Sequence, residues 1–88
     1  MQEQNDKPRF TPTESVVAEI WMEALQIDGI VSNDNFFELG GDSLTTMMML
    51  FRISDILNVD LPPDTLMAAP TFKEFCLSID SLLRQNYE

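Results

Sequence analysis

Histidine is absent from the 88 residues, and the chain holds a single cysteine. Without histidine, the chain has no Ser-His or Cys-His nucleophile pair and no histidine-ligated metal site. One cysteine forms neither an internal disulfide nor a zinc cluster, so a reducing, cytoplasmic environment is favoured. The chain also lacks a secretory signal and any apolar run approaching the roughly 18 residues of a membrane span. We therefore expect a cytoplasmic protein without membrane insertion.

Basic side chains are also few. Five Lys and Arg residues stand against 15 Asp and Glu residues, which gives a formal net charge of −10. Such acidity disfavours nucleic acid and anionic membranes as partners, and favours basic protein surfaces. A hydrophobic content of 44% argues against a disordered acidic tail. The length allows one domain with one modest core.

The spacing of the apolar residues predicts helices and no sustained strand pattern. The predicted fold class is an all-α four-helix bundle with three long helices, a short third helix and a long first loop. Residues 1–10 are expected to form a flexible N-terminal arm, and residues 11–86 the folded domain. The predicted helices cover about residues 12–26, 42–57 and 64–67, and a last helix begins near residue 71.

Local signals mark the ends of these helices. Thr11 and Glu14 form a Thr-x-x-Glu capping box, and Thr71 and Glu74 form a second one. Asn58 is a reasonable terminator of the second helix.

The connection over residues 28–41 is long for a compact domain. It begins with a helix stop signal, Asp28-Gly29, and ends with Gly40-Gly41. Four large apolar residues in it are expected to pin the loop onto the core: Ile30, Phe36, Phe37 and Leu39. Long ordered loops of this kind tend to be functional.

Ser43 follows Gly40-Gly41 and Asp42 and opens the second helix. The first backbone N–H groups of a helix lack intrahelical partners, and the helix dipole is positive there, so a phosphate on this serine is favourably placed. The glycines carry no side chain, so another protein's active site can approach the hydroxyl. A purely structural alternative is that Ser43 or Asp42 only caps the helix.

Three segments carry a resemblance to a known family. The central one is Asp34-Asn35-Phe36-Phe37-Glu38-Leu39-Gly40-Gly41-Asp42-Ser43-Leu44, and the others are Ile20–Leu25 and Ala69–Phe75. The sequence resembles the phosphopantetheine-binding carrier proteins (acyl and peptidyl carrier proteins) over about residues 12–84. It is most similar to the peptidyl carriers of nonribosomal peptide synthesis, whose fold is a four-helix bundle.

The resemblance implies a carrier and not an enzyme. Ser43 aligns with the serine whose hydroxyl attacks the diphosphate of coenzyme A and so receives 4′-phosphopantetheine. Gly41, Asp42 and Leu44 complete the motif, and Asp42 either assists recognition by the transferase or stabilises the turn. The thiol of the arm then holds an aminoacyl, peptidyl or acyl group as a thioester.

The partners that the resemblance implies are a phosphopantetheinyl transferase acting with magnesium, an adenylation (loading) enzyme, and downstream condensation, tailoring or thioesterase enzymes. We expect a free-standing monomer. Two alternatives come from other classes. Gly41-Asp42-Ser43-Leu44 also spells the signature of the Gly-Asp-Ser-Leu esterases, but that chemistry needs a histidine. The remaining alternative is an unmodified acidic helical protein-interaction module.

The second helix has more apolar surface than one buried stripe requires. We expect one stripe in the core, formed by Met49, Leu50, Ile53, Ile56 and Leu57. We expect the other to be an exposed recognition patch, formed by Leu44, Met47, Met48 and Phe51 with Arg52 at its edge. Arg52 is the only charged residue in 43–54, so close recognition by this helix should be apolar. The acidic residues in the rest of the chain should provide long-range steering toward basic partners. Trp21 and Cys76 are expected in the core.

Overall fold

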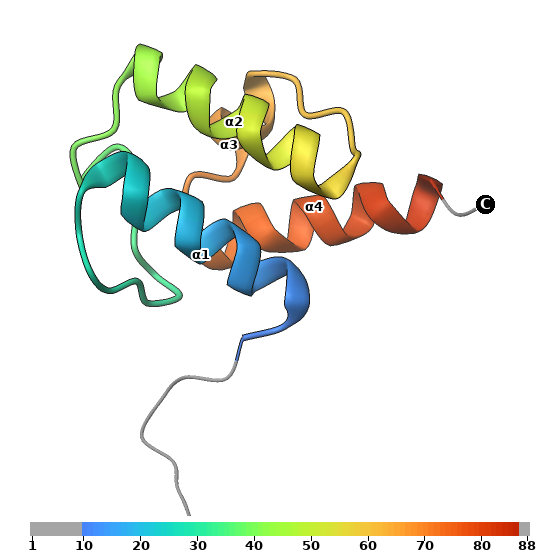
Figure 1. The fold of residues 1–88 in the computed structure, drawn as a ribbon, viewed down its shortest axis with the longest axis horizontal. Helices are drawn as coiled ribbons and strands as arrows, with labels where there is room; N and C mark the ends of the chain where they lie inside the picture. Colours follow the sequence, from blue (N-terminus) through green and yellow to red (C-terminus); the bar gives the residue numbers. More distant parts are fainter. Residues whose placement is uncertain (1–9, 87–88) are drawn as a thin grey trace, which may run out of the picture.

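The fold is known from a computed structural model that describes residues 10–86, which contain four helices. These are α1 (Pro12–Leu25), α2 (Ser43–Leu57), α3 (Asp64–Ala68) and α4 (Phe72–Asn86). Helix α1 packs against both α2 and α4, and the short α3 contacts α4 (Figure 1). The predicted all-α bundle with a short third helix is confirmed. The predicted arm, apart from Phe10, lies outside the described residues, among which no helix is long and apolar enough to cross a membrane.

The helix ends follow local chemistry. The Glu14 N–H donates to Thr11 Oγ1 over 3.1 Å, and the Thr11 N–H donates to Glu14 Oε1 over 3.0 Å, so the first capping box is confirmed. Asn58 ends α2 in the left-handed conformation, with φ 56°. The predicted end of α1 near Gln26 is confirmed to within one residue, because the helix ends at Leu25 and Gln26 caps it with φ 58°, before Asp28-Gly29.

The second capping box is formed in part. The Glu74 N–H donates to Thr71 Oγ1 over 3.3 Å, and this is the one side-chain capping bond that the described residues form at the start of α4.

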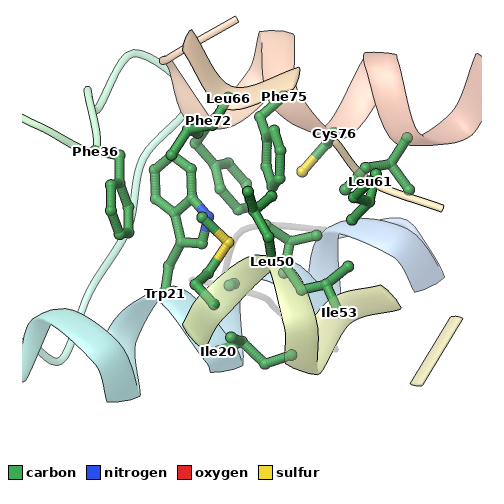
Figure 2. Close-up of a cluster of buried hydrophobic side chains, with 14 of the residues drawn as sticks. Ile20, Trp21, Phe36, Leu50, Ile53, Leu61, Leu66, Phe72, Phe75 and Cys76 are labelled. Atoms are coloured by element: carbon green, nitrogen blue, oxygen red, sulfur yellow. The ribbon is translucent and has the colours of Figure 1, made fainter. Parts of the chain in front are cut away.

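The core is centred on an aromatic cluster (Figure 2). The Trp21 ring is fully buried, and its centroid lies 5.0 Å from that of Phe36, 5.5 Å from Phe72 and 5.9 Å from Phe75. The first two contacts are edge-on, the arrangement that aromatic quadrupoles prefer. The cluster therefore joins α1, the first loop and α4.

Burial of Trp21 has one unfavourable component. Its indole Nε1 has no hydrogen-bond partner among the described residues. An unsatisfied buried donor costs about 1–3 kcal/mol. Burying roughly 200 Å² of aromatic surface stabilises by about 5 kcal/mol, so the apolar contribution is the larger one.

Cys76 also lies in the core, as predicted. Burial raises the pKa of its thiol to about 12, and the negative charges of Glu14 and Asp80 act in the same direction. The neutral thiol is therefore retained at physiological pH, and Cys76 behaves as a small apolar residue.

Short backbone connections fix the first loop against the start of α4. The Phe36 N–H donates to the Pro70 carbonyl over 3.0 Å, and the Phe72 N–H donates to the Asp34 carbonyl over 2.8 Å. Asn35 Oδ1 accepts from the two N–H groups that follow Phe36 in the chain, which tightens the turn. These bonds tie the first loop to the start of α4.

Phe37 departs from the prediction. The expectation that it lies in the core with Phe36 is wrong, because 39% of its surface is exposed. Consecutive side chains in a tight turn point in different directions, and only Phe36 can reach Trp21. The Phe37 ring instead packs edge-on against Phe36, with 5.8 Å between centroids.

Phe10 also departs from its assignment to the arm. Its ring centroid lies 5.6 Å from that of Phe72, and the residue is partly buried against the core. Phe10, which the prediction placed in the arm, is therefore in contact with the folded domain.

Gly41 is required by close packing. A Cβ atom there would lie 2.3 Å from the Phe36 ring and 2.8 Å from the Phe36 carbonyl oxygen. The glycine therefore serves the chain's own loop, a role that the sequence analysis did not assign to it. Glycine is favoured at position 40 for a different reason. Its φ is +109°, a backbone conformation that other residues rarely adopt, and no atom lies near the place of a Cβ.

We expect Gly41→Ala to lower the free energy of unfolding by about 1–3 kcal/mol, the usual effect of overpacking. Gly29→Ala is the matched control, because its Cβ would meet open space. Urea unfolding followed by Trp21 fluorescence measures both. Equal stability of the two variants would contradict this account of the Gly41 position.

Candidate functional site

The candidate site is the N-terminus of α2. Asp42 is the N-cap: its Oδ1 accepts from the Thr45 N–H over 2.9 Å, and the Asp42 N–H donates to Thr45 Oγ1 over 2.8 Å. These reciprocal bonds form a capping box in which Thr45 takes the place usual for Glu or Gln. The sequence analysis missed the role of Thr45, because Asp-x-x-Thr is not the usual pattern.

The capping bonds also act on the charge of Asp42. The Thr45 backbone N–H, followed by the Thr45 hydroxyl, holds the pKa of the Asp42 carboxyl below its ordinary value. The carboxylate is therefore fully ionised at neutral pH and committed to the turn. Of the two roles left open for Asp42, the structure contains the turn-stabilising one.

Ser43 is the first helical residue and is exposed. Its hydroxyl makes no hydrogen bond within residues 10–86, because Asp42 supplies the cap. The alternative in which Ser43 itself caps the helix is therefore wrong. The hydroxyl stays free for chemistry at the positive end of a 15-residue helix.

A groove of about 390 Å³ begins at Ser43. Its walls come from the first loop, α2, the turn before α3, and α3 itself: Phe37, Asp42, Ser43, Thr46, Met47, Pro63 and Met67. The buried Thr46 hydroxyl has no hydrogen-bond partner in the described part of the chain. The site thus offers a free hydroxyl, a mainly apolar groove and one unused buried polar group.

Four groove residues were not among the predicted site residues: Phe37, Thr46, Pro63 and Met67. Phe37 was expected in the core, while Pro63 and Met67 follow in the chain by some 20 residues or more and reach the groove only when α3 folds back. Met67 is 71% exposed, and an exposed methionine on a short helix was the one signal that could have indicated it.

The predicted apolar patch lies at the surface. Leu44 is 68% exposed, Met47 56%, Met48 57% and Phe51 75%. Arg52 is exposed too, but its guanidinium Nη1 donates to Glu23 Oε1 of α1. Its charge is therefore already opposed by a carboxylate, which leaves the patch as an apolar surface with no unopposed charge.

The other stripe of α2 faces the core only in part. Met49, Leu50 and Ile53 are buried as predicted, and Leu57 is half-buried. The prediction is wrong for Ile56, which is 55% exposed. Ile56 instead lines a hollow between α1 and α2.

Comparison with known proteins gives one family. Residues 15–79 match the family described as "Phosphopantetheine attachment site". Among curated proteins, the chain is 35% identical over 81 residues to L-2-aminoadipate reductase of Saccharomyces cerevisiae, which covers 90% of this chain and 6% of the reductase. It is 39% identical over 74 residues to gramicidin S synthase 2 of Brevibacillus brevis, which covers 84% of this chain and 2% of the synthase.

The likeness extends to solved structures. One of them holds the phosphopantetheine transferase Sfp with coenzyme A and a peptidyl carrier protein. The matching chain superposes with a TM-score of 0.77 at 34% identity, covering 83% of this chain and 95% of that one. The whole domain of this protein therefore corresponds to one domain-sized chain there, and to a small part of the curated relatives.

Asp42→Ala should lower the thermal unfolding midpoint at pH 7, because the first turn of α2 loses its cap. Asp42→Asn keeps a side-chain acceptor and should lose less.

The pKa of Asp42 is lower in the folded state than in the unfolded state. The stabilisation of the fold by Asp42 is therefore present above the unfolded pKa, and it is lost as pH falls through the folded value. Circular-dichroism melts from pH 7 to below 3.8, the ordinary pKa of an aspartate carboxyl, test this. Equal melts of Asp42→Ala and wild type at pH 7 would exclude the capping role.

Proposed function

The chain belongs to the family of phosphopantetheine-attachment domains, which are non-catalytic carriers, and from this premise we propose that Ser43 is the residue that receives the group. The cofactor is 4′-phosphopantetheine, derived from coenzyme A, and its terminal thiol holds the carried intermediate as a thioester. The observation that supports Ser43 is its exposed hydroxyl at the first turn of α2, left free by the Asp42 cap.

The residues around Ser43 fit this group. The first backbone N–H groups of α2 and the helix dipole favour the phosphodiester that forms on the serine. The adjoining groove offers apolar walls from Phe37, Met47 and Met67 to the hydrocarbon part of the arm. Gly41 holds the turn, and Leu44 is the first residue of the apolar patch.

We further propose the peptidyl subclass, in which aminoacyl or peptidyl intermediates of a natural-product pathway are delivered to partner enzymes in the cytoplasm. Support comes from the likeness to gramicidin S synthase 2 and to a peptidyl carrier protein. The proposed partners are a phosphopantetheinyl transferase, an adenylation enzyme for loading, and condensation, tailoring or thioesterase enzymes downstream. The structure with the transferase Sfp supports the first of these.

The proposal includes a free-standing monomer. In the described residues, all four helices contribute to the one core cluster, which supports independent folding. An immunoblot of the native host tests this part. A band at the 10.1 kDa of this chain is expected, and a band of several hundred kilodaltons would identify a module of a synthetase instead.

Attachment at Ser43 has a direct test. Incubation with coenzyme A, magnesium and a broad-specificity phosphopantetheinyl transferase should add one phosphopantetheine to the wild type, measured by intact mass spectrometry. Ser43→Ala should gain nothing, and Thr45→Ala, which keeps Ser43, should still be modified. An unmodified wild type, or an equal adduct on Ser43→Ala, would leave the acidic interaction module as the better account.

We also propose that Leu44, Met47, Met48 and Phe51 form the surface on which these enzymes dock. Four exposed apolar side chains on one helix beside Ser43 cost solvation free energy in the isolated protein, and a partner recovers it on binding. The methionines suit a surface that must fit several partners in turn. Arg52, held by Glu23, lies at the edge of this patch and contributes less.

Met47→Asp should reduce transfer by the phosphopantetheinyl transferase or loading by the adenylation enzyme by about tenfold or more, since charge is placed within an apolar interface. Leu77→Asp is the matched control, because Leu77 is 55% exposed and lies on α4. Kinetic constants for both steps, with circular dichroism to check folding, are the measurement. Wild-type rates in every reaction for a folded Met47→Asp protein would rule out this surface.

A further inference from the structure

A second surface lies between α1 and α2, apart from the proposed site at Ser43. A trough of about 540 Å³ separates the two helices and is lined by Val16, Glu19, Ile20, Met22, Glu23, Arg52 and Ile56. A smaller hollow of about 210 Å³ shares Ile20, Glu23 and Arg52 with it and reaches Met48. The two hollows together follow the line along which α1 and α2 lie side by side (Figure 1).

The trough has an apolar floor that the fold leaves open. Ile56, which the helix pattern assigns to the core, is 55% exposed at one end, and Met48 is 57% exposed at the other. Val16 and Met22 are partly buried between them and the core. Apolar side chains in a groove between two packed helices form a binding site for the apolar stripe of a third helix.

Two of the three charged side chains that line the trough are acidic, Glu19 and Glu23. Glu14, Glu19 and Glu23 are the charged residues of α1, which has no basic one. Arg52 is the one cation that lines the trough, and it is paired with Glu23. The exposed Glu19 lacks such a partner among the described residues, and Asp55 is exposed next to Ile56. An occupant with Lys or Arg beside an apolar stripe therefore complements this surface.

From this juxtaposition we infer that the trough between α1 and α2 binds a basic amphipathic helix of a partner protein. Ile56 follows Ser43 by 13 positions of one helix, so the rise per residue separates them by about 20 Å along α2. An occupant of the larger hollow contacts none of the residues that line the groove at Ser43. A protein bound there holds the carrier near its enzymes while the Ser43 end visits one active site after another, which raises the effective concentration at each of them.

The test uses the full chain labelled with ¹⁵N and a synthetic amphipathic helical peptide with leucines on one face and lysines on the other. A peptide of the same composition, scrambled to remove the apolar stripe, is the control for charge alone. Titration by NMR should shift resonances of Val16–Glu23 and Arg52–Ile56. Ile56→Asn should raise the dissociation constant about tenfold, because one apolar contact is lost without a change of charge. Glu19→Lys should weaken binding and its salt dependence.

Leu77→Asn is the matched control, with the same 55% exposure on α4, and should bind the peptide as the wild type does. Equal binding of the scrambled peptide, shifts spread over the acidic surface, shifts gathered at Leu44–Phe51, or wild-type affinity of Ile56→Asn would each overturn the inference. Phosphopantetheinylation of Ile56→Asn, measured in parallel, should match the wild type. A failure of the attachment proposal at Ser43 and a failure of the trough inference are thus detected by separate experiments.

Discussion

The Phe36 ring is held between Trp21 and the bare backbone of Gly41, and the rest of the structure depends on this contact. It fixes the first loop to α1, and the backbone bonds to the start of α4 on either side of Phe36 fix the same loop to the last helix. The turn that presents Ser43 begins directly after Gly41. The position of the Ser43 hydroxyl is therefore set by the aromatic core.

Asp42 and Ser43 have separate roles in the turn. Asp42 and Thr45 satisfy one another and the end of the helix, so neither the cap nor the turn needs the hydroxyl of Ser43. A serine used as its own cap would have to give up a hydrogen bond before reacting. Assigning the cap to Asp42 keeps the helix stable and leaves the Ser43 hydroxyl without an intramolecular partner.

Helix α2 has three distinct surfaces. One stripe closes the core, a second is exposed beside Ser43, and the last turn borders the trough on α1. The charge follows the same division. Arg52 is the single charged residue over 43–54, and its partner Glu23 belongs to the acidic α1. The patch beside Ser43 is therefore suited to apolar recognition, and the trough to a basic partner. One short helix can thus serve contacts of two different chemistries.

Local sequence determined much of this protein. Capping boxes, stop signals and apolar periodicity predicted the four helices, and the motif around Ser43 indicated the candidate site, because these features depend on residues a few positions apart. Tertiary packing decided the remainder. It turned Phe36 inward and Phe37 outward, left Ile56 exposed, paired Arg52 with Glu23, and brought Pro63 and Met67 to Ser43. These outcomes depend on where the helices cross and end against one another, and no spacing along the chain specifies that geometry.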